Sequence, residues 1–260
     1  MPDPSGVDLT MTMNPKDFAP RPELLAGRVI LITGASSGLG RALAIAAAAA
    51  GASVILCGRS GPKLERVYDE IEAQGGPQPA IAATDLATAA ALQYDELAAR
   101  IDADFGRLDG LVHCAGLLGD RAPLEQYDVP TWCRVLHVNL TAPFILTQVL
   151  LPALRKSADA SVIFVSSSVV RQQRPFWGAY AVAKTGLESF RSMLAQEVEG
   201  TANIRVNSMN PGRMRTKMRA AAYPAEDPNS LPAPESVTGA FLYLLSADAR
   251  GVSGEYLEAQ

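Results

Sequence analysis

A tyrosine and a lysine, Tyr180 and Lys184, stand four residues apart in the segment Tyr-Ala-Val-Ala-Lys. On a helix this spacing puts both side chains on one face. A free phenol has a pKa of about 10, and a neighbouring ammonium favours the phenolate and so lowers that pKa. A phenol adjusted in this way can serve as a general acid or base. The pair alone leaves open a half-buried tyrosine beside a solvated lysine.

A glycine-rich segment at residues 33–40, Thr-Gly-Ala-Ser-Ser-Gly-Leu-Gly, is the second candidate for chemistry. The apolar run before it, at 29–32, indicates a buried strand, and the sequence from 42 onward indicates a helix. At such a junction, backbone N–H groups and the helix dipole favour a bound anion. The spacing differs from Gly-x-Gly-x-x-Gly, so the segment alone leaves open an ordinary tight turn.

The composition narrows the class of protein. The chain has 260 residues, 48% of them hydrophobic, which is enough to bury a sizeable core. Its net charge of −4 and its lack of a basic run argue against a nucleic-acid partner. The cysteines are odd in number and far apart, which indicates reduced thiols rather than disulfides or a metal site: Cys57, Cys114 and Cys133. We therefore expect no bound metal.

Targeting and membrane segments are not evident in the sequence. Residues 1–22 are rich in proline and carry acids without an apolar stretch, so they do not resemble a secretory signal. We expect residues 1–24 to form a flexible arm. The uncharged stretch at 42–57 is too short for a membrane span and is interrupted by Gly51. The sequence therefore predicts a soluble, cytoplasmic protein.

Apolar strand-like runs alternate with helical patterns along the rest of the chain. The expected strands lie at 29–32, 53–57, 80–83, 108–113, 161–166, 204–209 and 255–257. The expected helices lie at 42 onward, 62–74, 87–105, 131–154, 179–199 and 234–246. This alternation predicts a parallel sheet with helices on both faces and a ligand site beyond the carboxyl ends of its strands. We predict α/β architecture: one doubly wound (Rossmann) domain over 25–260 with a mostly parallel seven-stranded sheet.

Several motifs occur in order along the chain and together resemble those of the single-domain short-chain dehydrogenases/reductases (SDR). Segment 33–40 is similar to that family's Thr-Gly-x-x-x-Gly-x-Gly, and Ser167 stands thirteen residues before Tyr180, which is the family's spacing. The other matching positions are Asp85-Leu86 after the third strand, Asn139 in Val-Asn-Leu, and Pro211-Gly212 followed by Thr216. The match covers about residue 25 to the C-terminus.

The resemblance implies a catalytic group of four residues. In the reductive direction Tyr180 would give a proton to the substrate oxygen, and Ser167 would hydrogen-bond the same oxygen. Lys184 would hold the nicotinamide ribose and lower the pKa of the tyrosine, while Asn139 would keep a water beside the lysine. These roles imply hydride transfer between a nicotinamide and a carbonyl or alcohol carbon.

The resemblance also implies a dinucleotide site around the glycine-rich segment. In NAD enzymes the second strand ends in an acid that accepts from the ribose 2′-OH. Here Gly58 stands in that place, and Arg59 follows with a guanidinium suited to a phosphate. The sequence therefore favours NADP(H) over NAD(H), although Arg59 as a solvated surface residue is left open. The expected cofactor residues are Gly34, Ser36, Ser37, Gly38, Leu39, Gly40, Arg59, Asp85, Leu86, Ala115, Gly116, Asn139, Tyr180, Lys184, Pro211, Gly212, Met214 and Thr216.

One motif departs from the family pattern. The family usually has Asn-Asn-Ala-Gly after the fourth strand, and this chain has His113-Cys114-Ala115-Gly116. In this family the second asparagine normally joins strands of the sheet through side-chain hydrogen bonds. Its replacement is therefore expected to affect the local rigidity of the sheet more than the chemistry. His113 is the next acid–base candidate after Tyr180, although a structural role is favoured.

Residues 213–234 hold four prolines and little apolar periodicity, and in this family such a segment is a mobile lid over the substrate. The lid and the loop before Tyr180 are rich in cations: Arg171, Arg174, Arg213, Arg215, Lys217 and Arg219. These charges indicate an anionic substrate or, as the favoured interpretation, solvated charges, contacts to cofactor phosphates and contacts between subunits.

The predicted function is that of an NADP(H)-dependent oxidoreductase acting on a ketone, an aldehyde or an alcohol. An NADP(H)-binding regulator with little turnover is the alternative, and it would be expected to lack part of the catalytic group. Segments 117–120, 177–180 and 218–220 resemble, more narrowly, the bacterial YciK-like oxidoreductases. In this family long helices pair across two-fold axes, so we expect a homotetramer or, failing that, a homodimer.

Overall fold

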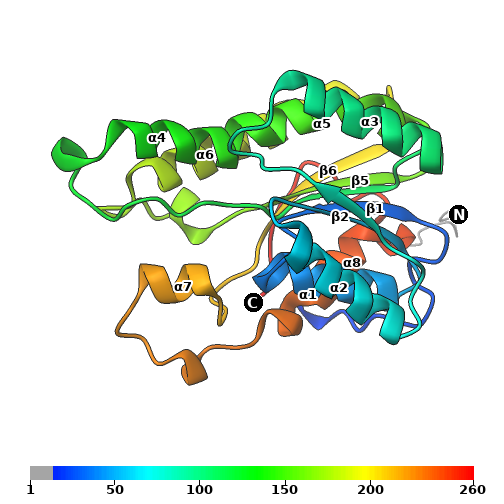
Figure 1. Cartoon of the computed structure of the whole chain (residues 1–260), viewed down its shortest axis with the longest axis horizontal. Helices are drawn as coiled ribbons and strands as arrows, with labels where there is room; N and C mark the ends of the chain where they lie inside the picture. The colour runs from blue at the N-terminus through cyan, green and yellow to red at the C-terminus, as the bar shows by residue number, and fades with distance from the viewer. Residues whose placement is uncertain (1–13) are drawn as a thin grey trace, which may run out of the picture.

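A single sheet of seven strands runs through the middle of the molecule (Figure 1). The computed structural model describes residues 14–260, and its strands lie in the order β3-β2-β1-β4-β5-β6-β7. Every neighbouring pair is parallel, so the predicted doubly wound α/β fold is confirmed. The strands are β1 (Val29–Thr33), β2 (Ser53–Gly58), β3 (Ala80–Ala83), β4 (Gly110–His113), β5 (Ala160–Val165), β6 (Ile204–Asn210) and β7 (Tyr256–Glu258).

Two groups of helices cover the two faces of the sheet (Figure 1). Strand β1 shows how one strand serves both cores, because successive side chains of a strand point to opposite faces. Ile30 and Ile32 pack in one core, and Leu31 packs in the other. The first core holds α1 (Gly38–Ala49), α2 (Gly61–Ala73) and α8 (Thr238–Leu245); the second holds α3 (Ala91–Phe105), α5 (Ala142–Arg155) and α6 (Gly178–Val198).

The chain reverses its direction across the sheet between β1 and β4. Strands β1 to β3 are added outward on one side, and the chain then returns to place β4 on the other side of β1. Loops that follow neighbouring strands diverge at such a point and leave a crevice at the carboxyl ends. The glycine-rich segment follows β1 and therefore lies at this crevice.

Several observed helices differ from the predicted ones. The helix predicted at 131–154 consists of α4 (Val129–Leu136), a π-helical turn (His137–Thr141) and α5 in succession. Helix α3 begins at Ala91 rather than at 87, because Asp85 accepts from the backbone of Ala87 and holds a turn there. The lid contains a short helix that the sequence did not reveal, α7 (Lys217–Ala222).

The described part of the predicted N-terminal arm packs against the body of the protein. Leu24 and Leu25 are buried, and the ring of Phe18 lies 5.3 Å from that of Tyr243 on α8. Arg21 forms an ion pair with Asp248. Residues 14–24 therefore differ from the predicted flexible arm, because apolar side chains anchor them. The rest of that prediction, residues 1–13, lies outside the described residues.

One continuous helical stretch, Val129–Arg155, is long and apolar enough to cross a membrane by length and composition. In this fold one face of the stretch is internal, because many of its apolar side chains pack in the second core. Leu146, Leu150 and Leu154 have no exposed surface. The apolar character of this stretch is thus explained by burial against the sheet and the neighbouring helices α3 and α6.

Candidate active site

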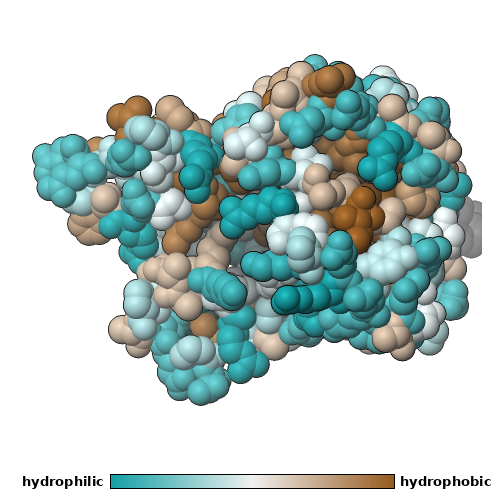
Figure 2. Space-filling model, viewed as in Figure 1, coloured by the Kyte–Doolittle hydropathy of each residue, from teal (hydrophilic) through white to brown (hydrophobic). Residues whose placement is uncertain are grey.

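A cavity of about 970 Å³ opens at the carboxyl ends of the strands. Figure 2 shows this face of the molecule hollowed between the projecting lid and the rest of the surface. Asn139 and Lys184 do not form its wall but are buried, with 1% and 4% of their surfaces exposed. All other predicted site residues line it: Gly34, Ser36, Ser37, Gly38, Leu39, Gly40, Arg59, Asp85, Leu86, Ala115, Gly116, Ser167, Tyr180, Pro211, Gly212, Met214 and Thr216.

The junction between β1 and α1 requires glycine at two positions, one in the loop and one in the first turn of α1. Gly34 has a φ of +69°, and a Cβ there would lie 2.9 Å from the Cα of Ala115. A Cβ at Gly40 would overlap the carbonyl oxygen of Gly34. The two glycines therefore let this loop fold tightly against α1 and against the loop after β4. As a result, the N-terminal end of the twelve-residue α1 opens onto the cavity, where its N–H groups can receive an anion.

The loop after β4 is fastened to β1 by the side chain of Thr33. The backbone N–H groups of Cys114 and Ala115 both donate to Oγ1 of Thr33, each at 3.0 Å. These bonds join the loop after β4 to the end of β1, at the place where the family's second asparagine is replaced by cysteine. Burial raises the pKa of the Cys114 thiol to about 12, so this thiol stays protonated near neutral pH.

His113 is buried between a hydroxyl and an aromatic ring. Its Nε2 pairs with Oγ1 of Thr147 on α5 at 2.8 Å, and its ring stacks on Phe164 with centroids 4.8 Å apart. Burial, together with the nearby Lys184 ammonium, lowers the pKa of His113 to about 3. The imidazole is therefore neutral at physiological pH, and its contacts fit a structural role rather than proton transfer.

Ser167 and Tyr180 meet at the wall of the cavity. Ser167 follows β5, and Tyr180 lies in the first turn of α6. Burial raises the pKa of the Tyr180 phenol above its ordinary value, and a hydrogen bond with Ser167 acts in the opposite direction. The net lowering that the sequence predicted is not found, because burial outweighs what favours the phenolate; the ammonium of Lys184 lies 5.8 Å from the ring centroid. The phenol is consequently neutral, which is its proton-donating form.

Lys184 supplies a buried positive charge one helical turn from Tyr180. Its Nζ donates to the carbonyl oxygen of Val165 at the end of β5, at 2.7 Å. Burial lowers the pKa of Lys184 from 10.5 to about 8. The side chain is therefore still an ammonium at pH 7, although with a smaller margin than a surface lysine has.

Asn139 lies in the π-helical turn between α4 and α5. Its Oδ1 accepts from the N–H of Leu117 at 2.8 Å, and its Nδ2 donates to the carbonyl of Leu117 at 2.7 Å. The side chain thus fastens the loop after β4. Four residues further on is Pro143, which has no N–H, so the carbonyl oxygen of Asn139 has no α-helical donor. This turn packs on α6, the helix that carries Lys184.

The end of β2 gathers cations and hydroxyls on one side of the cavity. Gly58 ends the strand, and a Cβ there would lie 3.8 Å from Oγ of Ser36. Arg59, Ser60 and Lys63 line the same cavity. Within residues 14–260, neither Arg59 nor Lys63 forms an ion pair. Two cations and two hydroxyls form a set of donors suited to a phosphate.

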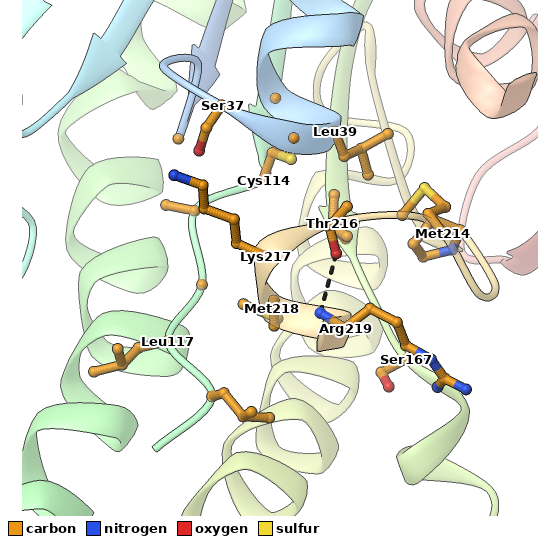
Figure 3. A pocket seen from close by; sticks show the side chains of 18 of the residues that line it. Ser37, Leu39, Cys114, Leu117, Ser167, Met214, Thr216, Lys217, Met218 and Arg219 are labelled. Atoms are coloured by element: carbon orange, nitrogen blue, oxygen red, sulfur yellow. Dashed lines mark hydrogen bonds between the residues drawn. The ribbon is translucent and has the colours of Figure 1, made fainter. Parts of the chain in front are cut away.

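The lid carries α7 and projects from the body of the molecule (Figure 1). Oγ1 of Thr216 accepts from the N–H of Arg219 at 3.1 Å and so caps the helix (Figure 3). The methyl group of Thr216 faces the glycine-rich loop, since a Cβ at Gly38 would lie 3.6 Å from it. The base of α7 is therefore packed on the loop that begins α1.

An arginine and two aromatic rings connect the lid to the loop after β4. The guanidinium of Arg121 lies 4.7 Å from the ring centroid of Trp177 and 5.2 Å from that of Tyr223. It also donates to the carbonyl of Ala222 at the end of α7. We call Arg121, Trp177 and Tyr223 the aromatic clamp. Because Trp177 and Tyr223 also line the cavity near Tyr180, the clamp gives the substrate end an aromatic wall.

Sequence reasoning missed several residues of the cavity wall. Gln260 is one of them: its Nε2 donates to the carbonyls of Pro211 and Arg213, at 2.9 and 3.0 Å. No motif marks this residue, because its role depends on where β7 ends. Others follow strands or precede Tyr180, and these positions could have identified them: Thr84, Leu117, Ser166 and Trp177. Within the described part of the chain, no three His, Cys, Asp or Glu side chains are grouped to hold a metal ion.

Most of the chain matches one protein family. The family model for short chain dehydrogenases matches residues 28–227. The chain belongs to the short-chain dehydrogenases. Among members of this family, the oxidoreductase YciK of Escherichia coli K12 is 44% identical over 243 residues, which are 94% of this chain and 96% of YciK. The resemblance predicted from the motifs is therefore confirmed, including the narrower one to YciK.

Solved structures of short-chain dehydrogenases share this fold over nearly the whole chain. One from Pseudomonas syringae has a TM-score of 0.92 and 52% identity, and the match covers 94% of this chain and 99% of that one. One from Escherichia coli CFT073, in complex with NADPH, has a TM-score of 0.90 and 45% identity, with coverage of 93% and 100%. The architecture of a short-chain dehydrogenase thus extends well beyond the residues that carry its motifs.

Proposed function

We propose that this short-chain dehydrogenase is an NADP(H)-dependent oxidoreductase that interconverts a carbonyl compound and an alcohol. The observation that carries the proposal is the meeting of Ser167 and Tyr180 at one cavity wall, with Lys184 buried one helical turn away. All four positions of the predicted catalytic group are filled, which favours an enzyme over a binding protein without turnover.

The residues of the cavity fit a nicotinamide dinucleotide. The N-terminal end of α1 suits a diphosphate, and the donors around Arg59 suit a 2′-phosphate. Oγ of Ser166 is buried at the cavity wall without a partner in residues 14–260, so a polar group entering there would satisfy it. When bound, NADP(H) supplies the hydride donor or acceptor.

The chain's own residues would handle the substrate oxygen and its proton. In the reductive direction, the neutral phenol of Tyr180 donates its proton to the carbonyl oxygen as negative charge develops there. Ser167 donates a hydrogen bond to the same oxygen. The ammonium of Lys184 stabilises the phenolate that remains. A water held by the carbonyl of Asn139 returns a proton to this pair.

An assay of NADPH oxidation with a panel of ketones, aldehydes and quinones tests the proposal. We expect the absorbance of NADPH to fall with at least one carbonyl compound and to stay constant without it. The aromatic wall formed by Trp177 and Tyr223 favours carbonyl compounds that carry a ring. Stoichiometric binding of NADPH without turnover of any compound in the panel would favour the regulator instead.

Replacing Arg59 with alanine is expected to raise the KM for NADPH ten-fold or more, while the kinetics with NADH barely change. A hydrogen bond to a charged group contributes about 1.5–3 kcal/mol, and only NADPH has a 2′-phosphate to receive it. Arg66→Ala is the matched control, because Arg66 is exposed on the following helix α2 and does not line the cavity. Equal losses with both cofactors would remove Arg59 from this role.

We also propose that the protein is a homotetramer, or a homodimer if the second interface is weak. Helices α5 and α6 carry large apolar side chains that are exposed in the single chain, namely Phe144, Val182 and Met193. Burying them against a second copy would remove this apolar area from water. Sedimentation at micromolar concentration should give a mass four times, or for a dimer twice, the 27.5 kDa of one chain, and Val182→Glu should lower it. A wild-type monomer would contradict this assembly.

A further inference from the structure

The side chain of Lys217 reaches from the lid toward the glycine-rich loop. In the view of Figure 3, its ammonium is directed toward Ser37, at the beginning of α1. Lys217 and Ser37 both line the same cavity. The lid thereby brings a cation to the side of the cavity where the N–H groups of α1 already favour an anion.

Nothing in the described chain accounts for the charge of Lys217. Its ammonium lines the cavity and forms no ion pair within residues 14–260. Arg219, two positions further along α7, shows the contrast: it is bound to Glu226 by hydrogen bonds of 2.5 and 2.6 Å. The lid thus pairs Arg219 internally and leaves Lys217 facing the cavity.

The position of Lys217 is set by contacts at both ends of α7. At its beginning, the methyl group of Thr216 packs toward Gly38. At its end, Arg121 of the aromatic clamp donates to the carbonyl of Ala222. Both contacts join the lid to loops that form the cavity, so they hold the first residue of α7 over the glycine-rich loop.

We propose that Lys217 is a lid residue that binds the diphosphate of the dinucleotide. This inference rests on the proposed use of a nicotinamide dinucleotide. It assigns a different phosphate to each cation: the 2′-phosphate to Arg59, which directly follows β2, and the diphosphate to Lys217 on the lid. Because NADPH and NADH share the diphosphate, Lys217 contributes to affinity for both cofactors, whereas Arg59 contributes only to that for NADPH.

Calorimetric titration with two fragments of the cofactor separates these roles without any turnover. ADP carries the diphosphate and no 2′-phosphate, and 2′-AMP carries the 2′-phosphate and no diphosphate. We expect Lys217→Met to raise the Kd of ADP, NADH and NADPH by about ten-fold and to leave that of 2′-AMP unchanged. Arg59→Ala should do the reverse with the two fragments. Lys217→Arg, which keeps the charge, should restore most of the affinity for ADP.

Two controls make the result specific. Lys156→Met removes a lysine on the surface away from the cavity, where it pairs with Asp102, and should change no Kd. Arg121→Met breaks the aromatic clamp without removing a cation from the cavity wall. It should raise the Kd of ADP, as Lys217→Met does. An unchanged Kd for ADP in Lys217→Met would overturn the proposal. Failure of the wild-type protein to bind 2′-AMP would instead count against the NADP(H) assignment and leave Lys217 in its role.

Discussion

Replacing Tyr180 with phenylalanine is expected to lower kcat by about 10²- to 10⁴-fold, the usual contribution of general acid catalysis. The substitution removes one oxygen and keeps the ring, which packs near Trp177 with centroids 5.9 Å apart. The fold and the affinity for NADPH should therefore survive. The measurement is kcat on a carbonyl compound found active in the panel, with the Kd of NADPH determined by fluorescence.

Tyr127→Phe is the matched control for Tyr180→Phe. Tyr127 belongs to the same aromatic cluster and is buried to a similar extent, but it does not line the cavity. Its hydroxyl accepts from the N–H of Asp120 at 3.2 Å, so the variant should lose some stability and little activity. Near-full turnover by Tyr180→Phe would show that another group donates the proton.

The fold could be predicted because its strands are nearly continuous apolar runs. Leu31 and its neighbours Ile30 and Ile32 are all buried, as expected for a parallel strand covered on both faces. Alternation of such runs with helices leaves few topologies, and the glycine-rich segment marks the loop where the sheet order reverses. The resemblance to the family's spacing indicated that Ser167 and Tyr180 would meet, and the end of β5 and the beginning of α6 lie close along the chain.

Other features depend on contacts that no local pattern encodes. The π-helical turn at Asn139 was predicted as ordinary helix, although Pro143 four residues later was a usable signal. The aromatic clamp joins Arg121 to Trp177 and Tyr223, which are far from it in the chain. The predicted lowering of the Tyr180 pKa failed for a different reason. Helical spacing places two side chains on one face. It does not reveal that the ammonium of Lys184 donates to the carbonyl of Val165, or how deeply the phenol of Tyr180 is buried.

Replacing Lys184 with methionine should separate its catalytic role from its cost to stability. Loss of the ammonium should reduce kcat, because the phenolate of Tyr180 is no longer stabilised, and should raise the Kd of NADPH about ten-fold. The second effect concerns the free energy of unfolding. Burial lowers the pKa of Lys184 from 10.5 to about 8, which corresponds to about 3 kcal/mol against folding with the charged form.

This cost gives the wild-type protein a characteristic dependence of stability on pH. Between pH 8 and 10.5 the unfolded chain still binds the proton at Lys184 while the folded chain releases it, so the free energy of unfolding rises with pH relative to that of Lys184→Met. Below pH 8 both states are protonated, and the difference between the two proteins should be constant. The loss of the bond to Val165 adds an offset that does not depend on pH. Urea unfolding of both proteins between pH 7 and 9.5 measures the difference, in which the titration of groups common to both cancels. Parallel profiles would mean that Lys184 keeps an ordinary pKa in the folded protein, and the buried ammonium would then carry no such cost.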